Sequence, residues 1–121
     1  QYKKKFKVEG KNKKEIKKLL KDAISIEKSG AFSIVLECIT ANAAKKITSA
    51  LKIPTIGIGS SSHCDGQILV TDDMLGLSGF YPKFVKRYAN LNIIIKKAVK
   101  KYSKEIKSNV FPSKKNFLYG K

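Results

Sequence analysis

The sequence contains few cysteines and no long apolar run. Its two cysteines, Cys38 and Cys64, lie far apart and form no C-x-x-C motif, which predicts a reduced, cytoplasmic protein rather than one built on disulfides. Each of them adjoins an acidic residue, a neighbour that does not favour a reactive thiolate. No apolar stretch approaches the roughly 20 residues of a membrane span, and no signal peptide follows the basic N-terminus. We therefore expect no membrane partner.

Arginine is almost absent although the chain is strongly basic. Lysine and arginine together number 26 against 9 acidic residues, a net charge of +17, yet Arg87 is the only arginine. Proteins that bind nucleic acids usually use arginine as well, because its planar guanidinium binds phosphates and bases bidentately. The lysines are instead spread along the chain in pairs, on the predicted outer faces of helices. The favoured interpretation is a solvated surface with no nucleic-acid partner, and a lysine-rich nucleic-acid-binding protein is the alternative from a different class.

The chain also has no initiator methionine. Its 121 residues allow one small domain with a hydrophobic core but not two. The content of 42% hydrophobic residues excludes compositional disorder. No internal repeat or linker divides the sequence. We expect residues 1–121 to form a single partial domain that starts inside a longer protein.

Helical and strand-like patterns alternate along the chain. Asn12 and Glu15 resemble a helix N-cap and its partner, apolar residues then recur at helical spacing, and Gly30 can end this helix. A second helix begins after Thr40. Short apolar runs typical of buried parallel strands cover residues 32–36, 55–59 and 68–70. This alternation predicts an α/β fold with a parallel sheet or barrel.

Beyond Gly76 the sequence pattern becomes helical. Pro82 suits a first helical turn, and a stripe of Phe84, Val85 and Tyr88 follows it. A longer amphipathic helix comes next, with lysines outward and these residues inward: Ile94, Ile95, Ala98, Val99, Tyr102 and Ile106. The tail after Ser108 shows no periodicity.

Glu37 is the predicted catalytic residue. It directly follows an apolar strand, and ligands bind at the carboxyl ends of the strands in α/β barrels and parallel sheets. At the edge of an apolar core, desolvation favours the neutral form of a carboxylate, which suits a group that transfers protons. The alternative is a structural carboxylate that caps the helix beginning near Ala41.

Gly57 and Gly59 are the predicted cofactor-binding residues. They end the second strand, on the same edge as Glu37 if the strands are parallel, and paired glycines let the backbone approach a ligand and offer amide donors. The dinucleotide-binding fingerprint would need a third glycine where Ser62 stands, so we expect no nicotinamide site. A plain turn without a ligand is the alternative.

Two further polar clusters are not expected to be sites. The segment 60–65 contains serine, histidine and aspartate, but the members of a catalytic triad converge from separate segments. His63 and its neighbours lack a second pair of metal ligands at the usual spacing, and Asp65 predicts a turn before the third strand. Asp72 and Asp73 predict a solvated or helix-capping pair. We therefore assign no metal ligand in this chain.

Five motifs occur in a distinctive order along nearly the whole chain. They are G-A-F-S-I-V-L-E-C at 30–38, I-P-T-I-G-I-G at 53–59, C-D-G-Q-I-L-V at 64–70, D-M-L-G-L at 73–77 and P-K-F-V-K at 82–86. Together they resemble the second half of the ketopantoate hydroxymethyltransferase family. Five motifs in the right order and spacing are far more specific than a lone glycine pattern.

The resemblance implies a (β/α)8 TIM barrel, of which this chain would be the C-terminal part with trailing C-terminal helices. It implies transfer of a hydroxymethyl group from 5,10-methylenetetrahydrofolate to 3-methyl-2-oxobutanoate, giving 2-dehydropantoate in pantothenate biosynthesis, through an enolate stabilised by Mg2+. The family's proton acceptor is the glutamate of the V-L-E-C segment, here Glu37. The family's metal ligands and substrate-binding lysine lie upstream of this chain. We therefore expect an inactive fragment, and a homo-oligomer at full length.

Three departures from the family pattern concern the loop and the tail expected to contact the pterin. Residues 59–61 read Gly-Ser-Ser where the family usually has Gly-Ala-Gly, and residues 72–73 read Asp-Asp where it usually has His-Asp. The tail after Pro112 is lysine-rich where the family's is usually acidic with a histidine. A related metal-dependent lyase of a 2-oxo acid, with the same barrel and enolate chemistry, is the alternative enzyme.

Overall fold

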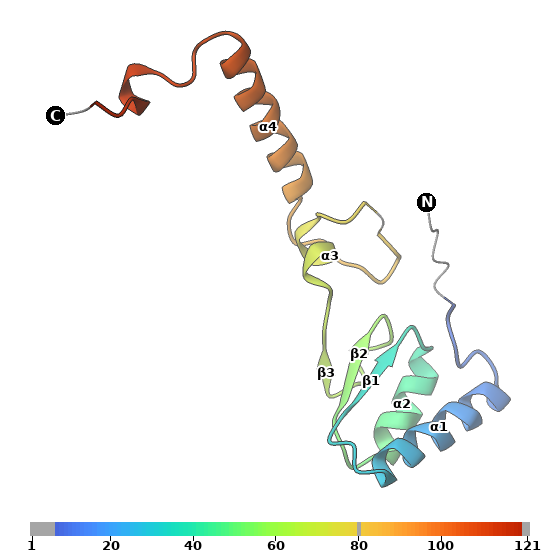
Figure 1. The fold of residues 1–121 in the computed structure, drawn as a ribbon. Coiled ribbons are helices and arrows are strands. Elements are labelled where there is room, and N and C mark those ends of the chain that lie inside the picture. The colour runs from blue at the N-terminus through green and yellow to red at the C-terminus, as the bar shows by residue number, and fades with distance from the viewer. Residues whose placement is uncertain (1–6, 80, 120–121) are drawn as a thin grey trace. The chain divides into compact units, whose positions relative to one another are not determined.

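The computed structural model describes residues 7–79 and 81–119 (Figure 1). Its helices and strands are, in chain order, α1 (Lys13–Lys28), β1 (Ile34–Glu37), α2 (Ala41–Ala50), β2 (Thr55–Ile58), β3 (Gly66–Gln67), α3 (Thr71–Leu75), α4 (Leu91–Lys107) and a short 3-10 helix (Lys114–Asn116). The chain divides into two compact units. Unit 1 comprises residues 1–70 and 80–86, and unit 2 comprises residues 71–79 and 87–121.

The three strands of unit 1 form one parallel sheet in the order β1-β2-β3. β1 pairs with β2 over its whole length, from Ile34 opposite Thr55 to Glu37 opposite Ile58. β3 adds two residues to the other edge of β2, with Gln67 opposite Gly57. The predicted α/β fold with a parallel sheet is therefore confirmed. A sheet of this kind is consistent with part of a barrel, because three strands are too few to close one.

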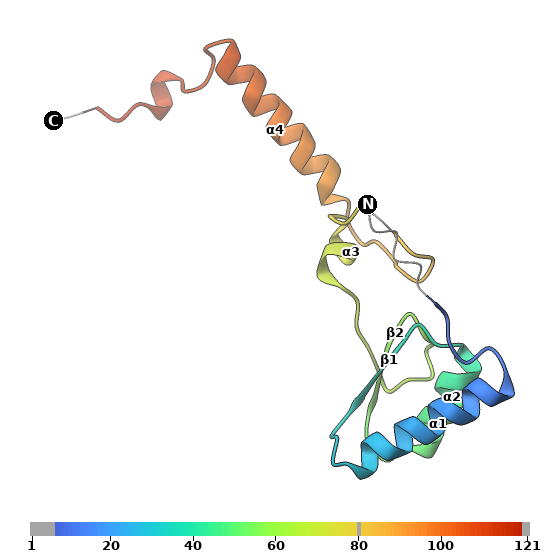
Figure 2. The ribbon, with the colours of Figure 1, turned by 45° about the vertical axis from the view of Figure 1, so that its right-hand side comes forward.

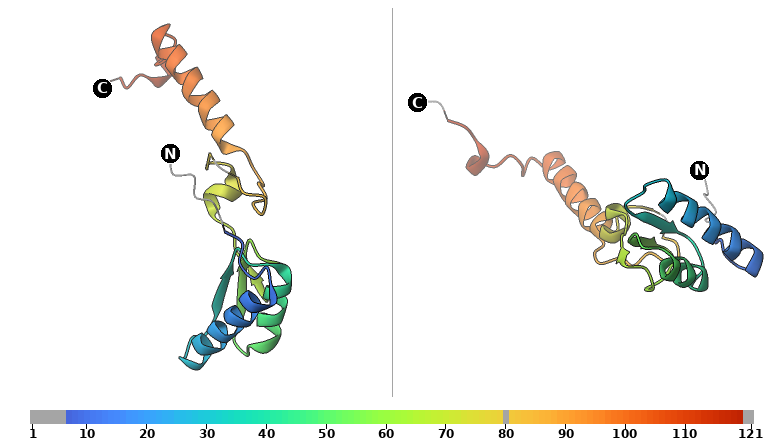
Figure 3. Two further views of the ribbon diagram at one scale, coloured as in Figure 1. Left: turned by 90° about the vertical axis from the view of Figure 1, so that its right-hand side faces the viewer. Right: turned by 90° about the horizontal axis from the view of Figure 1, so that it is seen from below.

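Helices α1 and α2 pack on one face of this sheet (Figures 2 and 3). The hydrophobic core lies between the helices and the sheet, where Leu36 of β1 meets Ile47 of α2 and Ile16 of α1. The remaining buried members of this core are Ala23, Ile39, Ala43, Ala44 and Cys64. The small side chains of Ala43 and Ala44, which are completely buried, allow α2 to pack closely in this core.

Both helices of unit 1 begin at the predicted caps. The Asn12 side chain accepts a hydrogen bond from the N–H of Glu15 at 2.9 Å. The Glu15 carboxylate in turn accepts from the N–H of Lys11, a contact that lowers the pKa of Glu15. Thr40 caps α2 by accepting from the N–H of Ala43 at 3.4 Å. These bonds satisfy N–H groups that the first turn of a helix otherwise leaves without a partner.

The strands are offset from their predicted ranges. β1 begins at Ile34 rather than at Phe32, whose side chain is 87% exposed, and it includes Glu37 as its last residue. β3 covers two residues before the predicted run at 68–70. The prediction of fully buried strands was also wrong, because Val35 remains 51% exposed on the face that no helix of unit 1 covers. Apolar runs mark a strand in sequence, whereas its bounds follow from backbone pairing.

The segment around Pro82 does not form the predicted helix. It makes a single turn, in which the N–H of Val85 donates to the carbonyl of Pro82 at 2.9 Å. The N–H of Tyr88 instead donates to the carbonyl of Met74 in unit 2 at 2.8 Å. Gly76 permits this arrangement, since a Cβ there would lie 2.5 Å from the carbonyl oxygen of Ala89. Sequence reasoning missed α3, the helix that precedes this glycine.

Helix α4 forms as predicted, but its apolar side chains do not face inward. None of its residues is buried. Its exposed large apolar residues are Ile93, Ile94, Ile95, Val99, Tyr102 and Ile106. No helix in the described ranges is long and apolar enough to cross a membrane.

Candidate active site at the carboxyl end of the sheet

The three residues predicted to act at the site meet at one end of the sheet. Glu37 is the last residue of β1 and lies opposite Ile58, the last residue of β2. Gly57 and Gly59 flank Ile58 along the chain. Because β1 and β2 are parallel, their carboxyl ends share one edge, and this edge brings the predicted catalytic residue beside the predicted cofactor-binding residues.

The carboxylate of Glu37 is free to contact a ligand. Side chains alternate between the faces of a strand, so Glu37 shares with Val35 the face opposite buried Leu36. Within the described residues the carboxylate has no hydrogen-bond or ion-pair partner. The residue is exposed, so burial in this chain does not desolvate it as expected. The helix-capping alternative is wrong, because Thr40 caps α2.

A hollow of about 310 Å3 lies between α1 and β1 and includes Glu37. Glu9 and Asp22 also line it, and its other lining residues are apolar. However, no group of three or more potential ligand side chains within the described ranges could hold a metal ion. Glu9, Asp22 and Glu37 therefore do not form a magnesium site here.

Gly57 and Gly59 make room for protein side chains. A Cβ on Gly57 would lie 2.8 Å from the side chains of Gln67 and Ser60. A Cβ on Gly59, whose φ is +63°, would lie 2.9 Å from the ring of Phe84. The positive φ of Gly59 favours glycine there, whereas the Gln67 and Ser60 side chains beside Gly57 can move. The carbonyl of Gly57 accepts a hydrogen bond from the N–H of Ile68 at 3.0 Å.

The loop before β3 is anchored by an aspartate whose role the sequence did not reveal. The Asp65 carboxylate accepts hydrogen bonds from the N–H of Thr55 at 2.8 Å and from its hydroxyl at 2.9 Å. The bond from this N–H lowers the pKa of Asp65. Thr55 is completely buried, and its hydroxyl also contacts that of Thr48 on α2 at 2.9 Å. His63 is exposed in the same loop. The Asp65 carboxylate is hydrogen-bonded to Thr55 rather than to His63.

Cys38 follows Glu37 in an uncommon backbone conformation. Its φ is +51°, a left-handed region that residues other than glycine rarely adopt. Its N–H donates to the carbonyl of Ile58 at 3.0 Å, and its carbonyl accepts from the N–H of Glu9 at 3.0 Å. Burial raises the pKa of the Cys38 thiol, and the charge of Glu37 raises it further. A raised pKa disfavours the thiolate form of Cys38 at neutral pH.

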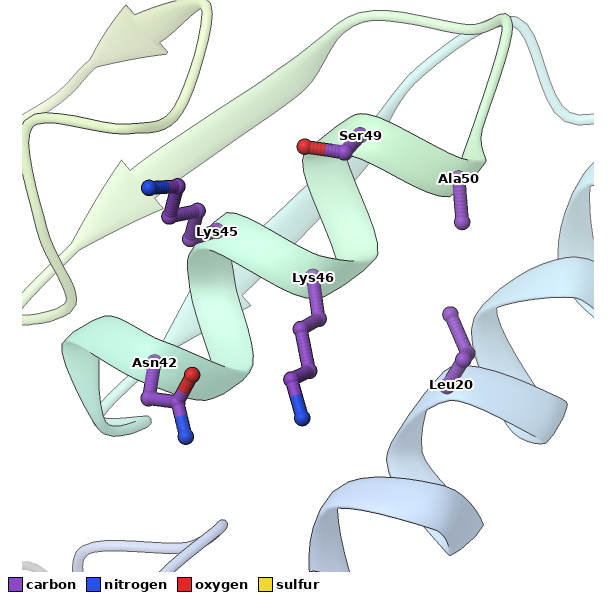
Figure 4. Close-up of a pocket in the computed structure, with 6 residues that line it drawn as sticks. All are labelled: Leu20, Asn42, Lys45, Lys46, Ser49 and Ala50. Carbon is purple, nitrogen blue, oxygen red and sulfur yellow. The ribbon is translucent and has the colours of Figure 1, made fainter.

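A second hollow, of about 490 Å3, lies between α1 and α2 (Figure 4). Lys45, Lys46, Asn42 and Ser49 supply its polar groups. Figure 4 shows that the ammonium groups of the two lysines point in different directions, as expected for neighbours on a helix. Because the polar groups do not converge on a common point, this hollow has no evident ligand chemistry.

Comparison with known proteins identifies a family that matches most of this chain. The profile of the ketopantoate hydroxymethyltransferase family matches residues 2–114. The 3-methyl-2-oxobutanoate hydroxymethyltransferase of Clostridium beijerinckii is 53% identical over 92% of this chain and 41% of its own length. The proteins of the same name from Enterococcus faecalis and Bdellovibrio bacteriovorus are 54% and 51% identical, over 88% and 91% of this chain and 39% and 42% of their own lengths.

The chain thus spans about two fifths of the length of the curated relatives it matches. The matched region includes all three strands of the sheet and the residues at their carboxyl ends. The chain belongs to the ketopantoate hydroxymethyltransferase family.

Proposed function

We propose that the full-length protein transfers a hydroxymethyl group from 5,10-methylenetetrahydrofolate to 3-methyl-2-oxobutanoate, giving 2-dehydropantoate for pantothenate biosynthesis. The observation that carries this proposal is the unpaired carboxylate of Glu37 at the carboxyl end of a parallel strand. The chain that carries Glu37 is more than half identical, over most of its length, to proteins named 3-methyl-2-oxobutanoate hydroxymethyltransferase. The names of those relatives identify the 2-oxo acid substrate, and the carboxylate at the strand end is the proposed base.

Glu37 is the proposed proton acceptor. The reaction begins when the C–H bond at C3 of the 2-oxo acid breaks, with the proton passing to a carboxylate oxygen and the electron pair to the enolate. A base for this step must reach the substrate without competing partners, and the Glu37 carboxylate has none within the described chain. Gly57 and Gly59 are proposed to offer backbone groups to the cofactor at the same edge.

The described residues do not fit Mg2+, since no cluster of ligand side chains is present among them. We therefore propose that the metal ligands lie in the part of the family chain outside this sequence. The chain would be the C-terminal part of a (β/α)8 barrel, with both of its units in one partial domain over residues 1–121. Three parallel strands, which are too few to close a barrel, support this placement. By itself such a piece would be inactive.

The full-length enzyme is proposed to be a cytoplasmic homo-oligomer, as its resemblance to the family implies. Two free, buried cysteines support a reducing compartment. The test of function uses the full-length protein that carries this chain, supplied with Mg2+. Loss of the C3 proton of 3-methyl-2-oxobutanoate in deuterated buffer is followed by NMR, with and without 5,10-methylenetetrahydrofolate.

The transferase should exchange the C3 proton without folate and form 2-dehydropantoate only when the folate is present. Exchange without any folate-dependent product would instead indicate the related metal-dependent lyase of a 2-oxo acid. A folded protein that shows no exchange would contradict both activities.

A further inference from the structure

We infer that Gly10 and Thr40 are positioning residues for Glu37, an inference that rests on the proposed function. Neither residue belongs to the strand that carries Glu37. Together they fasten the segment 38–40, which directly follows Glu37, to the backbone of residues 9–10 in front of α1. The direction in which the Glu37 side chain leaves the sheet depends on the backbone that this junction holds.

The segment after Glu37 is bonded on both sides. On one side, the N–H of Cys38 donates to the carbonyl of Ile58 in β2 at 3.0 Å. On the other side, the N–H of Glu9 donates to the carbonyl of Cys38 at 3.0 Å, and the N–H of Thr40 donates to the carbonyl of Glu9 at 2.9 Å. A parallel bridge between Glu9 and Ile39 results. Residues 9–10 thus continue the sheet beyond β1, at the end where Glu37 lies.

The hydroxyl of Thr40 closes this junction. It donates to the carbonyl of Gly10 at 2.7 Å and accepts from the N–H of Ala43 at 3.4 Å. One side chain therefore caps α2 and binds the backbone ahead of α1 at the same time. A capping role alone would explain the bond to Ala43, but it would not require the bond to Gly10.

Gly10 is the residue that lets the two backbones approach. It is buried, its φ is +78°, and a Cβ there would lie 2.7 Å from the Cβ of Ala43 and 3.1 Å from the Thr40 hydroxyl oxygen. Any side chain would push residues 9–10 away from α2 and weaken the bonds to Cys38 and Thr40. The left-handed conformation of Cys38 has to be held by its surroundings, and these bonds hold it.

Displacement of the base by about 1 Å can slow a reaction about 100-fold, because proton transfer needs close and aligned atoms. Loosening the junction should therefore slow proton abstraction more than it weakens substrate binding. A merely structural role would instead lower stability while the properly folded fraction kept its turnover. This difference makes the inference testable.

The experiment measures C3-proton exchange of 3-methyl-2-oxobutanoate by the full-length enzyme, with kcat and KM determined separately. Thr40→Val, which keeps the shape of the side chain but loses the hydroxyl, should lower kcat about 10-fold or more, with KM within about twofold. Thr40→Ser should restore the kcat, since serine keeps both hydrogen bonds. Gly10→Ala should lower kcat at least as much as Thr40→Val.

Each variant has a matched control in the same chain. Thr48→Val removes a hydroxyl from the same helix, but that hydroxyl contacts Thr55 at the other end of β2. Gly30→Ala introduces the same change at another positive φ, +92°, where a Cβ would meet no atom within 4 Å. Both controls should keep the wild-type kcat, even if they melt at lower temperature.

The inference is overturned if Thr40→Val and Gly10→Ala exchange at the wild-type rate, or if each loses no more kcat than its control. Provided that the wild type exchanges and Glu37→Gln does not, either result would leave the proposed function intact. Absence of exchange in the folded wild-type enzyme would overturn the proposed function, and this inference with it. If Thr40→Val does not fold, Gly10→Ala against Gly30→Ala decides the question.

Discussion

Helices α1 and α4 are similar in length and in amphipathic pattern but differ sharply in burial. They have 16 and 17 residues, and both place lysines on one face and apolar side chains on the other. Yet α1 buries Ile16 and Ala23 in the core of unit 1, whereas no residue of α4 is buried. Ile16 is 6% exposed and Ile94 is 60% exposed. The two helices therefore share the same apolar periodicity, but only α1 buries its apolar side chains.

The difference teaches what an amphipathic pattern can specify. Spacing of about 3.6 residues determines that a helix forms and which face is apolar. It does not identify the partner that covers this face. In unit 1 the partner is present, since α2 and β1 supply the other side of the core. Within unit 2, no residue of α4 is buried.

The largest expected effect comes from removing the same side chain in each helix. Ile16→Ala should lower the free energy of unfolding by about 2–4 kcal/mol, because it removes buried methyl groups and leaves a cavity. Ile94→Ala should change it by less than about 0.5 kcal/mol, because that side chain is already exposed. Urea unfolding followed by circular dichroism measures both. Equal losses would contradict the contrast between the helices.

A smaller, pH-dependent effect should come from Asp65 in unit 1. Its pKa is lowered in the folded chain, chiefly by the hydrogen bond from the N–H of Thr55, so its contribution to stability is complete at neutral pH. This contribution is lost progressively as the pH falls from roughly 4, the ordinary pKa of an aspartate, through the lower pKa of Asp65 in the folded chain. The urea midpoint of Asp65→Asn should therefore lie below that of the wild type at pH 7 and approach it in acid. A constant difference across this range would contradict the assignment.

The smallest effect distinguishes the helix caps. Asn12→Ala should cost about 1 kcal/mol, since the Asn12 side chain accepts from the N–H of Glu15. Asn90→Ala at the start of α4 should cost close to nothing, because Asn90 makes no side-chain cap bond. Urea midpoints at neutral pH provide the comparison. A larger loss at Asn90 than at Asn12 would reverse the expected order.

Much of unit 1 follows from local sequence signals. The caps at Asn12 and Thr40 were predicted, because capping depends on a few neighbouring residues. The position of Glu37 at a strand end was predicted as well, since the apolar run before it marks the strand. Strand bounds were less accurate, because Phe32 has the composition of a strand residue but no pairing partner in β2.

Other features depend on contacts that no local pattern shows. The Asp65 carboxylate binds Thr55, ten residues earlier in the chain, and its sequence context predicts only a turn. The junction of Gly10 and Thr40 joins residues 30 positions apart. The segment around Pro82 has a helix-like stripe but forms a single turn, and the N–H of Tyr88 donates to the carbonyl of Met74. The sequence indicates Glu37, and its supporting contacts appear only in three dimensions.

The central claim is that Glu37 is the proton acceptor, and one pair of variants of the full-length enzyme tests it most directly. Glu37→Gln removes the proposed base, whereas Glu9→Gln makes the same change at a residue of the neighbouring segment, which is bridged to Ile39. In Glu37→Gln, exchange of the C3 proton of 3-methyl-2-oxobutanoate should fall by about 100-fold or more, the loss expected when a general base is removed. In Glu9→Gln, the exchange rate should change little. Wild-type exchange by a folded Glu37→Gln enzyme would contradict the claim.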